Sequence, residues 1–187
     1  EGDTFAVQQK FAEAAAAYQA GFKQTPVAEM LVRTHGALLR AGKTAEADRM
    51  AAAWLKDKPQ DMAVPMYLAD VALSRNDLAT AEKYYLSVVK TEPARPQQAT
   101  AYNNLAWVTS QLKKDGAMAY AEKANALAPD QPAFMDTLAM LLADQQEFKK
   151  AIDLQNKAIG LPGGDNPTFK LNMARIYIQA GDKNAAR

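Results

Sequence analysis

A repeat with a period near 34 residues is the feature of this sequence that most limits how it can fold. An alanine recurs at intervals of 33 to 36 residues along most of the chain, and a proline stands twelve residues after each of the first four. A period of roughly 20 to 50 residues is the signature of stacked structural repeats, so the sequence predicts an array of similar units. The alanines are Ala14, Ala47, Ala81, Ala117, Ala151 and Ala186, and the prolines are Pro26, Pro59, Pro93 and Pro129.

Each period contains the pattern of two helices. Between Asp77 and Lys90, apolar residues recur at spacings of three and four, which indicates one buried helical face. Turn-forming triplets such as Ala41-Gly42-Lys43 and Ala180-Gly181-Asp182 divide the period in two. Since no segment alternates apolar and polar residues as a half-buried strand would, the sequence predicts an all-α chain of antiparallel helix pairs.

Two helix starts are marked by polar residues that suit the N-cap position. Asp130 precedes one predicted helix, and Asn166 stands before Pro167 at the start of another. A side-chain oxygen at this position accepts a hydrogen bond from a backbone N–H that has no partner within the helix. We therefore expect both side chains to cap helices.

In two copies the periodic alanine is followed four positions later by an aromatic residue, as in Ala14–Tyr18 and Ala81–Tyr85, and then by the proline that closes the second helix. With this pattern the sequence resembles the tetratricopeptide repeat (TPR) family. The resemblance covers essentially the whole chain, although Ala51, Ala121 and Gln155 replace the aromatic residue. It implies a right-handed superhelix, or α-solenoid, of antiparallel helix pairs. The expected organisation is a single array within a longer protein, with copies at 27–60, 61–94, 95–130 and 131–164 and partial copies at 1–26 and 165–187.

Four motifs resemble a narrower group, the bacterial TPR lipoproteins of PEP-CTERM/exosortase and exopolysaccharide systems. They are Asn103–Trp107, Tyr120–Ala124, Leu127–Asp130 and Asp136–Leu138. This resemblance implies a location in the bacterial envelope or periplasm. The chain has no cysteine, so it lacks the lipobox cysteine of such lipoproteins, and the cysteine count fits a reducing compartment equally well.

Composition argues against two classes of partner. The chain carries 22 Lys and Arg against 21 Asp and Glu, and the basic residues are scattered, so we expect no nucleic acid partner. There is no apolar run of about 18 residues, so we expect no membrane span in this chain. The resemblance to TPR proteins implies a protein or an extended peptide as the partner.

The sequence offers little for catalysis, and we expect neither enzyme activity, cofactor nor metal site. His35 is the only histidine, and its place among apolar residues predicts a packed, hydrogen-bonded core side chain. The glycine-rich stretch 160–167 lacks the Gly-Lys-Ser/Thr ending of a phosphate-binding loop and reads as a loop between repeats. Asp70, Asp136 and Asp144 are expected on an open, solvated face, where their pKa values would shift little.

The expected binding surface is the concave wall, which the first helix of each copy forms in stacked helix pairs. Small residues such as Ala106 and Ala139 recur on these helices and mark the face that packs against neighbours. The residues on the opposite face are therefore the candidates for partner binding. They are Arg33, Met66, Asp70, Asn103, Trp107, Asp136, Met140 and Arg175.

Trp107 is the main candidate because an exposed indole offers a large amphipathic contact, the usual character of a binding anchor. Asn103 lies one turn earlier and could pair with peptide backbone groups, while Met66 and Met140 could adapt to varied side chains. The alternative, that Trp107 packs against neighbouring helices, stays open at this point.

The sequence thus predicts a scaffold that binds a protein or peptide on a preformed surface, in an envelope or protein-sorting assembly if the narrower resemblance holds. Two alternatives stay open. The array could associate end to end with other copies through uncovered helix faces. It could also bind glycans through the aromatic faces of Tyr67, Tyr102 and Trp107.

Overall fold

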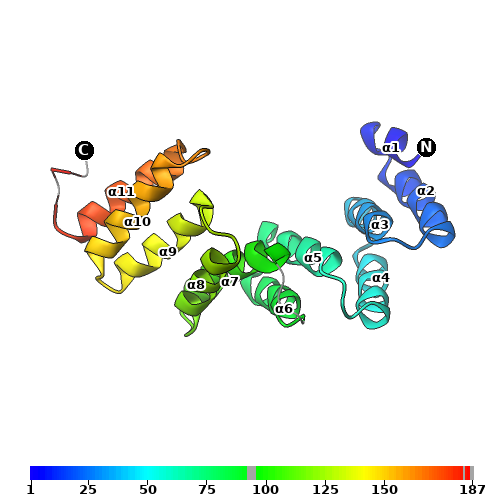
Figure 1. The fold of residues 1–187 in the computed structure, drawn as a ribbon. Helices are drawn as coiled ribbons and strands as arrows, with labels where there is room; N and C mark the ends of the chain where they lie inside the picture. The colour runs from blue at the N-terminus through cyan, green and yellow to red at the C-terminus, as the bar shows by residue number, and fades with distance from the viewer. Residues whose placement is uncertain (92–95, 183, 186–187) are drawn as a thin grey trace. The chain divides into compact units, whose positions relative to one another are not determined.

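The computed structural model describes residues 1–91, 96–182 and 184–185, so Pro93 and Ala186 of the repeat pattern lie outside the described residues. Within these ranges the chain forms eleven α-helices and one short 3-10 helix, and no strand (Figure 1). The predicted all-α fold class is confirmed. The chain divides into two compact units, 1–70 and 71–187, with the boundary inside one helix. The predicted division into copies of a single array stays a prediction.

The first unit contains four complete helices and the start of a fifth. They are α1 (Gly2–Val7), α2 (Phe11–Gln24), α3 (Ala28–Arg40), α4 (Thr44–Asp57) and the first part of α5 (Ala63–Ser74). From α1 to α4, each helix contacts the next. The predicted core histidine is confirmed here: His35 on α3 is buried, its Nδ1 lies 3.0 Å from the Tyr67 hydroxyl, and the two rings form a T-shaped pair.

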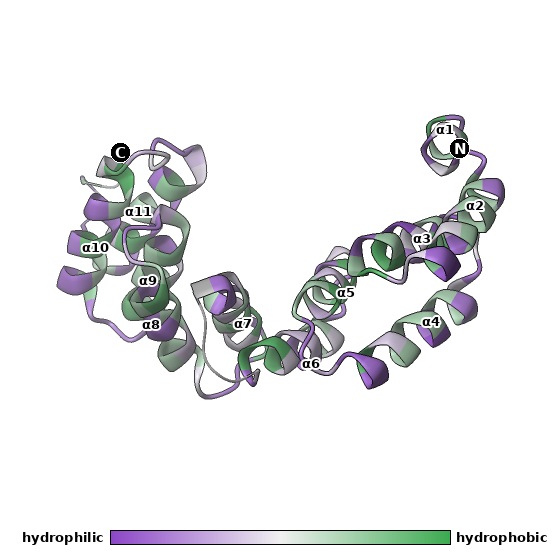
Figure 2. Ribbon diagram, turned by 45° about the vertical axis from the view of Figure 1, so that its right-hand side comes forward, coloured by the Kyte–Doolittle hydropathy of each residue, from purple (hydrophilic) through white to green (hydrophobic). Residues whose placement is uncertain are grey.

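The second unit contains the rest of the helices. They are the end of α5, α6 (Leu78–Val89), the 3-10 helix η1 (Pro96–Gln98), α7 (Ala99–Gln111), α8 (Ala117–Leu127), α9 (Pro132–Asp144), α10 (Phe148–Gly160) and α11 (Pro167–Gln179). α9 contacts α7, α8, α10 and α11, so the first helices of successive pairs lie side by side. Hydrophilic residues of α10 lie on its outer side (Figure 2). The largest fully buried side chains of the second unit include Tyr85, Leu105 and Ile176.

Within the described residues, the periodic alanines lie on the second helix of each pair and are buried. Ala47, Ala81 and Ala151 expose no surface, and Ala14 on α2 is equally buried. A methyl side chain lets two helices approach closely, and a larger side chain at these points would have no space in a closely packed interior. The period seen in the sequence is therefore the period of helix contact.

The turns inside the pairs share one backbone design. In each, the residue at the turn has a positive φ, its N–H donates to the carbonyl three residues back, and the next N–H donates to the carbonyl five residues back. For example, Gln146 N–H donates to Ala143 at 2.9 Å and Glu147 N–H to Leu142 at 2.9 Å. This is the Schellman closure of a helix C-terminus. The residues with positive φ are Gln9, Gly42, Asn76, Lys113, Gln146 and, after α11, Gly181.

Replacing Gln146 by glycine is expected to raise the free energy of unfolding by about 1 kcal/mol, because a side chain is strained at positive φ. Gln146 has a φ of 63° and an exposed side chain. Gln145 is a matched control, since it is exposed with a φ of −86°. There glycine should lower stability by roughly 0.5–1 kcal/mol. Urea unfolding followed by circular dichroism tests both, and equal effects of the two substitutions would contradict this account.

The two predicted helix caps have different outcomes. Asn166 caps α11 as expected, because its side chain accepts a hydrogen bond from Thr168 N–H at 2.9 Å. The prediction for Asp130 is wrong, since the N-cap of α9 is Gln131. Asp130 has a φ of 61°, whereas an N-cap residue takes extended backbone angles, and its carboxylate pairs with Lys157 at 2.8 Å.

The glycine-rich stretch forms the loop between α10 and α11, as expected. Gly164 is buried, and a Cβ there would lie 2.0 Å from the carbonyl oxygen of Ala158. Only a residue without a side chain lets the loop pass this close to the end of α10. The glycine therefore serves close packing of the chain.

Candidate partner-binding groove

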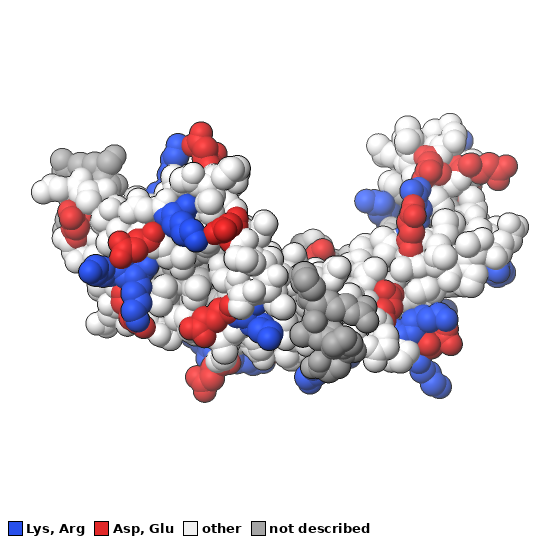
Figure 3. Space-filling view, in the orientation of Figure 1, with Lys and Arg blue, Asp and Glu red and all other residues white. Residues whose placement is uncertain are grey.

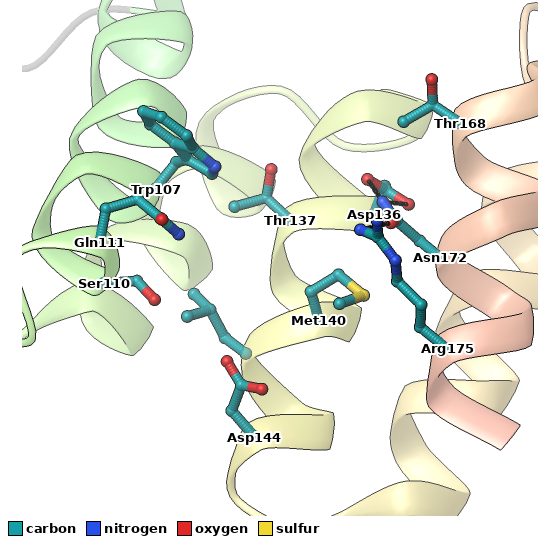
Figure 4. A pocket seen from close by; sticks show the side chains of 11 residues that line it. Trp107, Ser110, Gln111, Asp136, Thr137, Met140, Asp144, Thr168, Asn172 and Arg175 are labelled. Atoms are coloured by element: carbon teal, nitrogen blue, oxygen red, sulfur yellow. Dashed lines mark hydrogen bonds between the residues drawn. The ribbon is translucent and has the colours of Figure 1, made fainter. Parts of the chain in front are cut away.

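A cavity of about 370 Å³ lies in the second unit, between the first helices of three successive pairs (Figure 4). Its walls come from α7, α9 and α11, the helix class that the sequence predicts for the binding surface. Four of the eight predicted residues line it. They are Trp107, Asp136, Met140 and Arg175.

Trp107 is exposed on the α7 side of this cavity. The side chain is 46% exposed, while Leu105, Ala106 and Val108 beside it are buried. Figure 4 shows the indole at one wall, with Thr137 of α9 between it and Asp136. Of the two interpretations left open by the sequence, the exposure favours a contact residue over a packed core residue.

Asp136 is not the solvated carboxylate that the sequence predicts. It is only 9% exposed, because α10 and α11 cover this part of α9. Gln155 Nε2 donates to its Oδ1 at 2.5 Å, and Asn172 Nδ2 donates to Oδ1 at 3.1 Å and to Oδ2 at 2.9 Å. Asp136 can be buried because two amide side chains from the next helices, Gln155 and Asn172, donate the hydrogen bonds that water would otherwise give to its carboxylate.

The surroundings of Asp136 act on its ionisation in opposite directions. Burial is the larger effect and raises the pKa of this carboxyl above its ordinary value, while the hydrogen bonds from Gln155 and Asn172 lower it. Asp70 and Asp144 are exposed, as expected. The prediction that all three carboxylates have little shift is therefore wrong for Asp136.

Asn172 links the buried carboxylate to an arginine at the cavity. Its Nδ2 bonds Asp136, and its Oδ1 accepts a hydrogen bond from Arg175 Nη1 at 3.2 Å. The side chain of Gln155 is held by a second hydrogen bond, in which its Nε2 donates to the backbone carbonyl of Phe169 at 2.9 Å. We call Gln155, Asp136 and Asn172 the amide relay. The relay runs from a buried backbone group to an exposed guanidinium.

The other two candidates in this unit's row contribute differently. Met140 is half-buried on α9 and lines the cavity between Trp107 and Arg175 (Figure 4). Asn103 does not line the cavity, and its Nδ2 donates to Asn104 Oδ1 at 3.4 Å. Its position one turn before the indole does not bring its amide into the cavity wall.

The remaining predicted residues belong to the first unit. Arg33 pairs with Asp3 at 2.7 Å and with Glu29 at 2.9 Å. Met66 is half-buried and Asp70 is exposed, both on the first part of α5. The structure therefore brings together the candidates of the second unit, and a shared site with Arg33, Met66 and Asp70 stays a prediction.

Sequence reasoning missed several lining residues, of which Asn172 matters most. In this unit, each first helix contains an apolar residue followed directly by alanine, and a polar residue stands directly before that pair. The polar residues are Asn104, Thr137 and Asn172. Asn104 Nδ2 donates to the Tyr85 hydroxyl and Asn172 bonds Asp136, so the two asparagines join neighbouring helices, whereas Thr137 donates to the Ala133 carbonyl of its own helix. A polar residue repeated beside a core position was therefore a sign of buried hydrogen bonding.

The aromatic side chains proposed for glycans do not form a row of exposed faces. Tyr67 is half-buried and bonded to His35, and Tyr102 packs against Tyr120 with its hydroxyl donating to the Val89 carbonyl. Trp107 is the only exposed one of the three. Sugar binding through stacked aromatic faces thus gains no support from this geometry.

The surface charge is mixed. On the face drawn in Figure 3, acidic and basic side chains are interspersed over the described atoms.

Among the described residues, no group of three or more His, Cys, Asp or Glu could hold a metal ion. None of the described helices combines the length and apolar content that crossing a membrane requires.

Comparison with known proteins agrees with the helical geometry. Residues 36–99 match the tetratricopeptide repeat model. The chain is 26% identical over 200 residues to the human cell division cycle protein 16 homolog, covering 98% of this chain and 31% of that protein. The chain thus spans about a third of the length of this curated relative.

Solved structures show the same fold. A tetratricopeptide repeat protein from Parabacteroides merdae matches with a TM-score of 0.73 at 15% identity, covering 99% of this chain and 73% of that one. YrrB, described as a TPR protein with an unusual peptide-binding site, matches with a TM-score of 0.68 at 13% identity, covering 92% and 88%. At these identities the likeness concerns the fold alone.

Proposed function

We propose that this TPR chain is a scaffold that holds a protein or an extended peptide in the groove between α7, α9 and α11. The observation that carries the proposal is Trp107, nearly half exposed on the wall of a cavity of about 370 Å³. Burying an indole gives a large favourable contact, and such residues dominate the energy of many interfaces. Met140 beside it offers a flexible apolar side chain that adapts to different partners.

The shape of the groove favours an extended chain over a compact small molecule. A second cavity of about 260 Å³ is lined by Lys114, Asp115 and Met118 and shares Ser110, Leu141 and Asp144 with the first. The two cavities therefore adjoin along α7 and α9. An extended peptide could occupy both, with successive residues in neighbouring cavities.

The fold relatives are consistent with this proposal. YrrB has a peptide-binding site by its description, and it shares the fold of this chain. The resemblance of Asn103–Trp107 and Tyr120–Ala124 to envelope lipoproteins motivates a further part of the proposal, that the partner belongs to a bacterial envelope or exopolysaccharide assembly. That part rests on sequence motifs alone.

Replacing Trp107 by alanine is expected to weaken partner binding at least tenfold, because a central aromatic anchor typically contributes more than about 1.4 kcal/mol. Wild type and variant are used to capture proteins from bacterial envelope extract, and a captured protein is purified and titrated against both. Val7→Ala is the matched control, since Val7 is an apolar side chain that is 85% exposed on α1 and does not line the cavity.

Circular dichroism must show that the three proteins are equally folded. Retention by wild type and by Val7→Ala, with loss by Trp107→Ala, supports the groove. Equal retention by all three places the binding surface elsewhere and contradicts the proposal.

A second candidate function is end-to-end association of chains, which Leu171 and Ile178 favour. Both are large apolar side chains on α11, and both are more than half exposed. The equivalent face of α9 is covered by the following helices, as the burial of Asp136 and Ala143 shows. Sedimentation at several concentrations decides, because a monomer at all concentrations would exclude this function.

A further inference from the structure

Arg175 presents a charged group to the groove. Its side chain is exposed, and among the described residues its side chain makes one hydrogen bond, the 3.2 Å contact to Asn172 Oδ1. In the part of the chain that the structure describes, no carboxylate forms an ion pair with it. Arg33 differs, because Asp3 and Glu29 already occupy its guanidinium. Most of the N–H donors of Arg175 are thus available to a ligand.

The amide relay gives this guanidinium one oriented acceptor, the Asn172 side-chain oxygen. Asn172 must turn its NH₂ group toward the Asp136 carboxylate, because the opposite orientation would place two acceptors together. Its oxygen then necessarily faces Arg175. Gln155 is oriented in the same way, with its NH₂ group shared between Asp136 and the Phe169 carbonyl. A guanidinium held in this manner loses less conformational freedom when it binds.

The charge available to a ligand at this side of the groove is positive. Asp136 is nine-tenths buried, and its two oxygens already accept three N–H bonds, so it has little remaining capacity as an acceptor. A cationic side chain here would instead lie beside Arg175 and be repelled. Asp144 is exposed and also lines this cavity, at the part that adjoins the second cavity, where Ser110 and Leu141 are shared as well.

We propose that the partner places an aspartate or glutamate carboxylate on Arg175, while an apolar part of the same segment covers Trp107 and Met140. This inference rests on the proposed groove. The planar guanidinium can pair with both oxygens of a carboxylate, which gives orientation as well as attraction. Figure 4 shows the arrangement needed, with Met140 between the indole and the guanidinium. The partner is thus a segment that carries an acid near an apolar side chain.

Selection of displayed random linear peptides against the wild-type chain tests the inference. Peptides are kept if Trp107→Ala abolishes their binding, and the kept peptides are synthesised and titrated. They are expected to contain an Asp or Glu whose replacement by Asn or Gln weakens binding at least tenfold. Arg175→Gln should weaken binding by a similar factor, and the two changes together should cost little more than either alone.

Two further variants separate charge from geometry. Arg175→Lys keeps the charge but lacks the planar fork, so it should restore only part of the lost affinity. Arg75→Gln removes the same charge from an exposed position of the same unit outside the groove, and it should change affinity less than about twofold.

The outcomes distinguish this inference from the function on which it rests. Peptides that need Trp107 but show no preference for acids, or that bind Arg175→Gln normally, overturn the carboxylate contact and leave the groove in place. If no peptide is recovered whose binding depends on Trp107, the groove and the carboxylate contact both fail.

Discussion

Replacing Tyr85 by alanine is expected to lower the free energy of unfolding by about 3–5 kcal/mol, the usual cost of truncating a buried aromatic side chain. Tyr85 lies on α6, has no exposed surface and is the largest fully buried side chain of the chain's described part. Its removal leaves a cavity among close-packed helices, which the α-helical backbone cannot fill by collapse. Urea unfolding followed by circular dichroism measures the loss.

Tyr85→Phe separates the ring from the hydroxyl. Asn104 Nδ2 donates to this hydroxyl at 3.1 Å, so the phenylalanine variant keeps the packing and loses the hydrogen bond. A loss of roughly 1–2 kcal/mol is expected, because a buried amide donor is left without this acceptor. If Tyr85→Ala costs no more than Tyr85→Phe, the ring does not contribute through packing and this account is wrong.

Replacing Asp136 by alanine is expected to lower the free energy of unfolding by about 2–3 kcal/mol, because it leaves buried N–H groups of Gln155 and Asn172 without their acceptor. Gln155 keeps its bond to the Phe169 carbonyl, whereas Asn172 Nδ2 loses both of its contacts. The same urea titration measures this loss. A change below about 0.5 kcal/mol would mean that water replaces the carboxylate and that the relay is not structural.

The pH dependence of Asp136 gives a second readout. Burial raises the pKa of this carboxyl in the folded state above its ordinary value of 3.8, so the folded chain holds the proton more tightly than the unfolded chain. The contribution to stability is complete below pH 3.8 and is lost as the pH rises through the folded pKa.

Asp136→Asn cannot titrate, so the stability of wild type relative to this variant should fall across that window and then level off. The other carboxyl groups act equally in both proteins and cancel in the difference. A difference that stays constant between about pH 3 and pH 7 would show that the pKa is not raised.

The sequence predicted the helix pairs because their signals are local. Alanines such as Ala47 and Ala81 recur wherever helices touch, and the turn residues occur at the same point of every period. Asn76 and Gly42 also mark left-handed positions by residue type alone, since asparagine and glycine tolerate them. Local steric rules therefore suffice to place most helices.

The groove could be predicted only in part, because its chemistry depends on contacts between copies. Facing positions on α7, α9 and α11 gave Trp107, Met140 and Arg175, which line the same cavity. The same periodic rule treated Asp136 as exposed, although Asn172, 36 residues later, covers it. A period assigns equivalent places to residues, but only the particular side chains of the next copy decide which of those places water can reach.

The shared turn design bears on how the chain reaches its structure. Every turn inside a pair closes through backbone bonds that join residues at most five apart, such as Glu147 to Leu142, and no distant segment is needed to form them. Helical pairs of this kind order quickly, because closing a short loop costs little entropy. Refolding can thus begin at several places in the chain, and a substitution in one pair should slow the appearance of that pair more than that of the others.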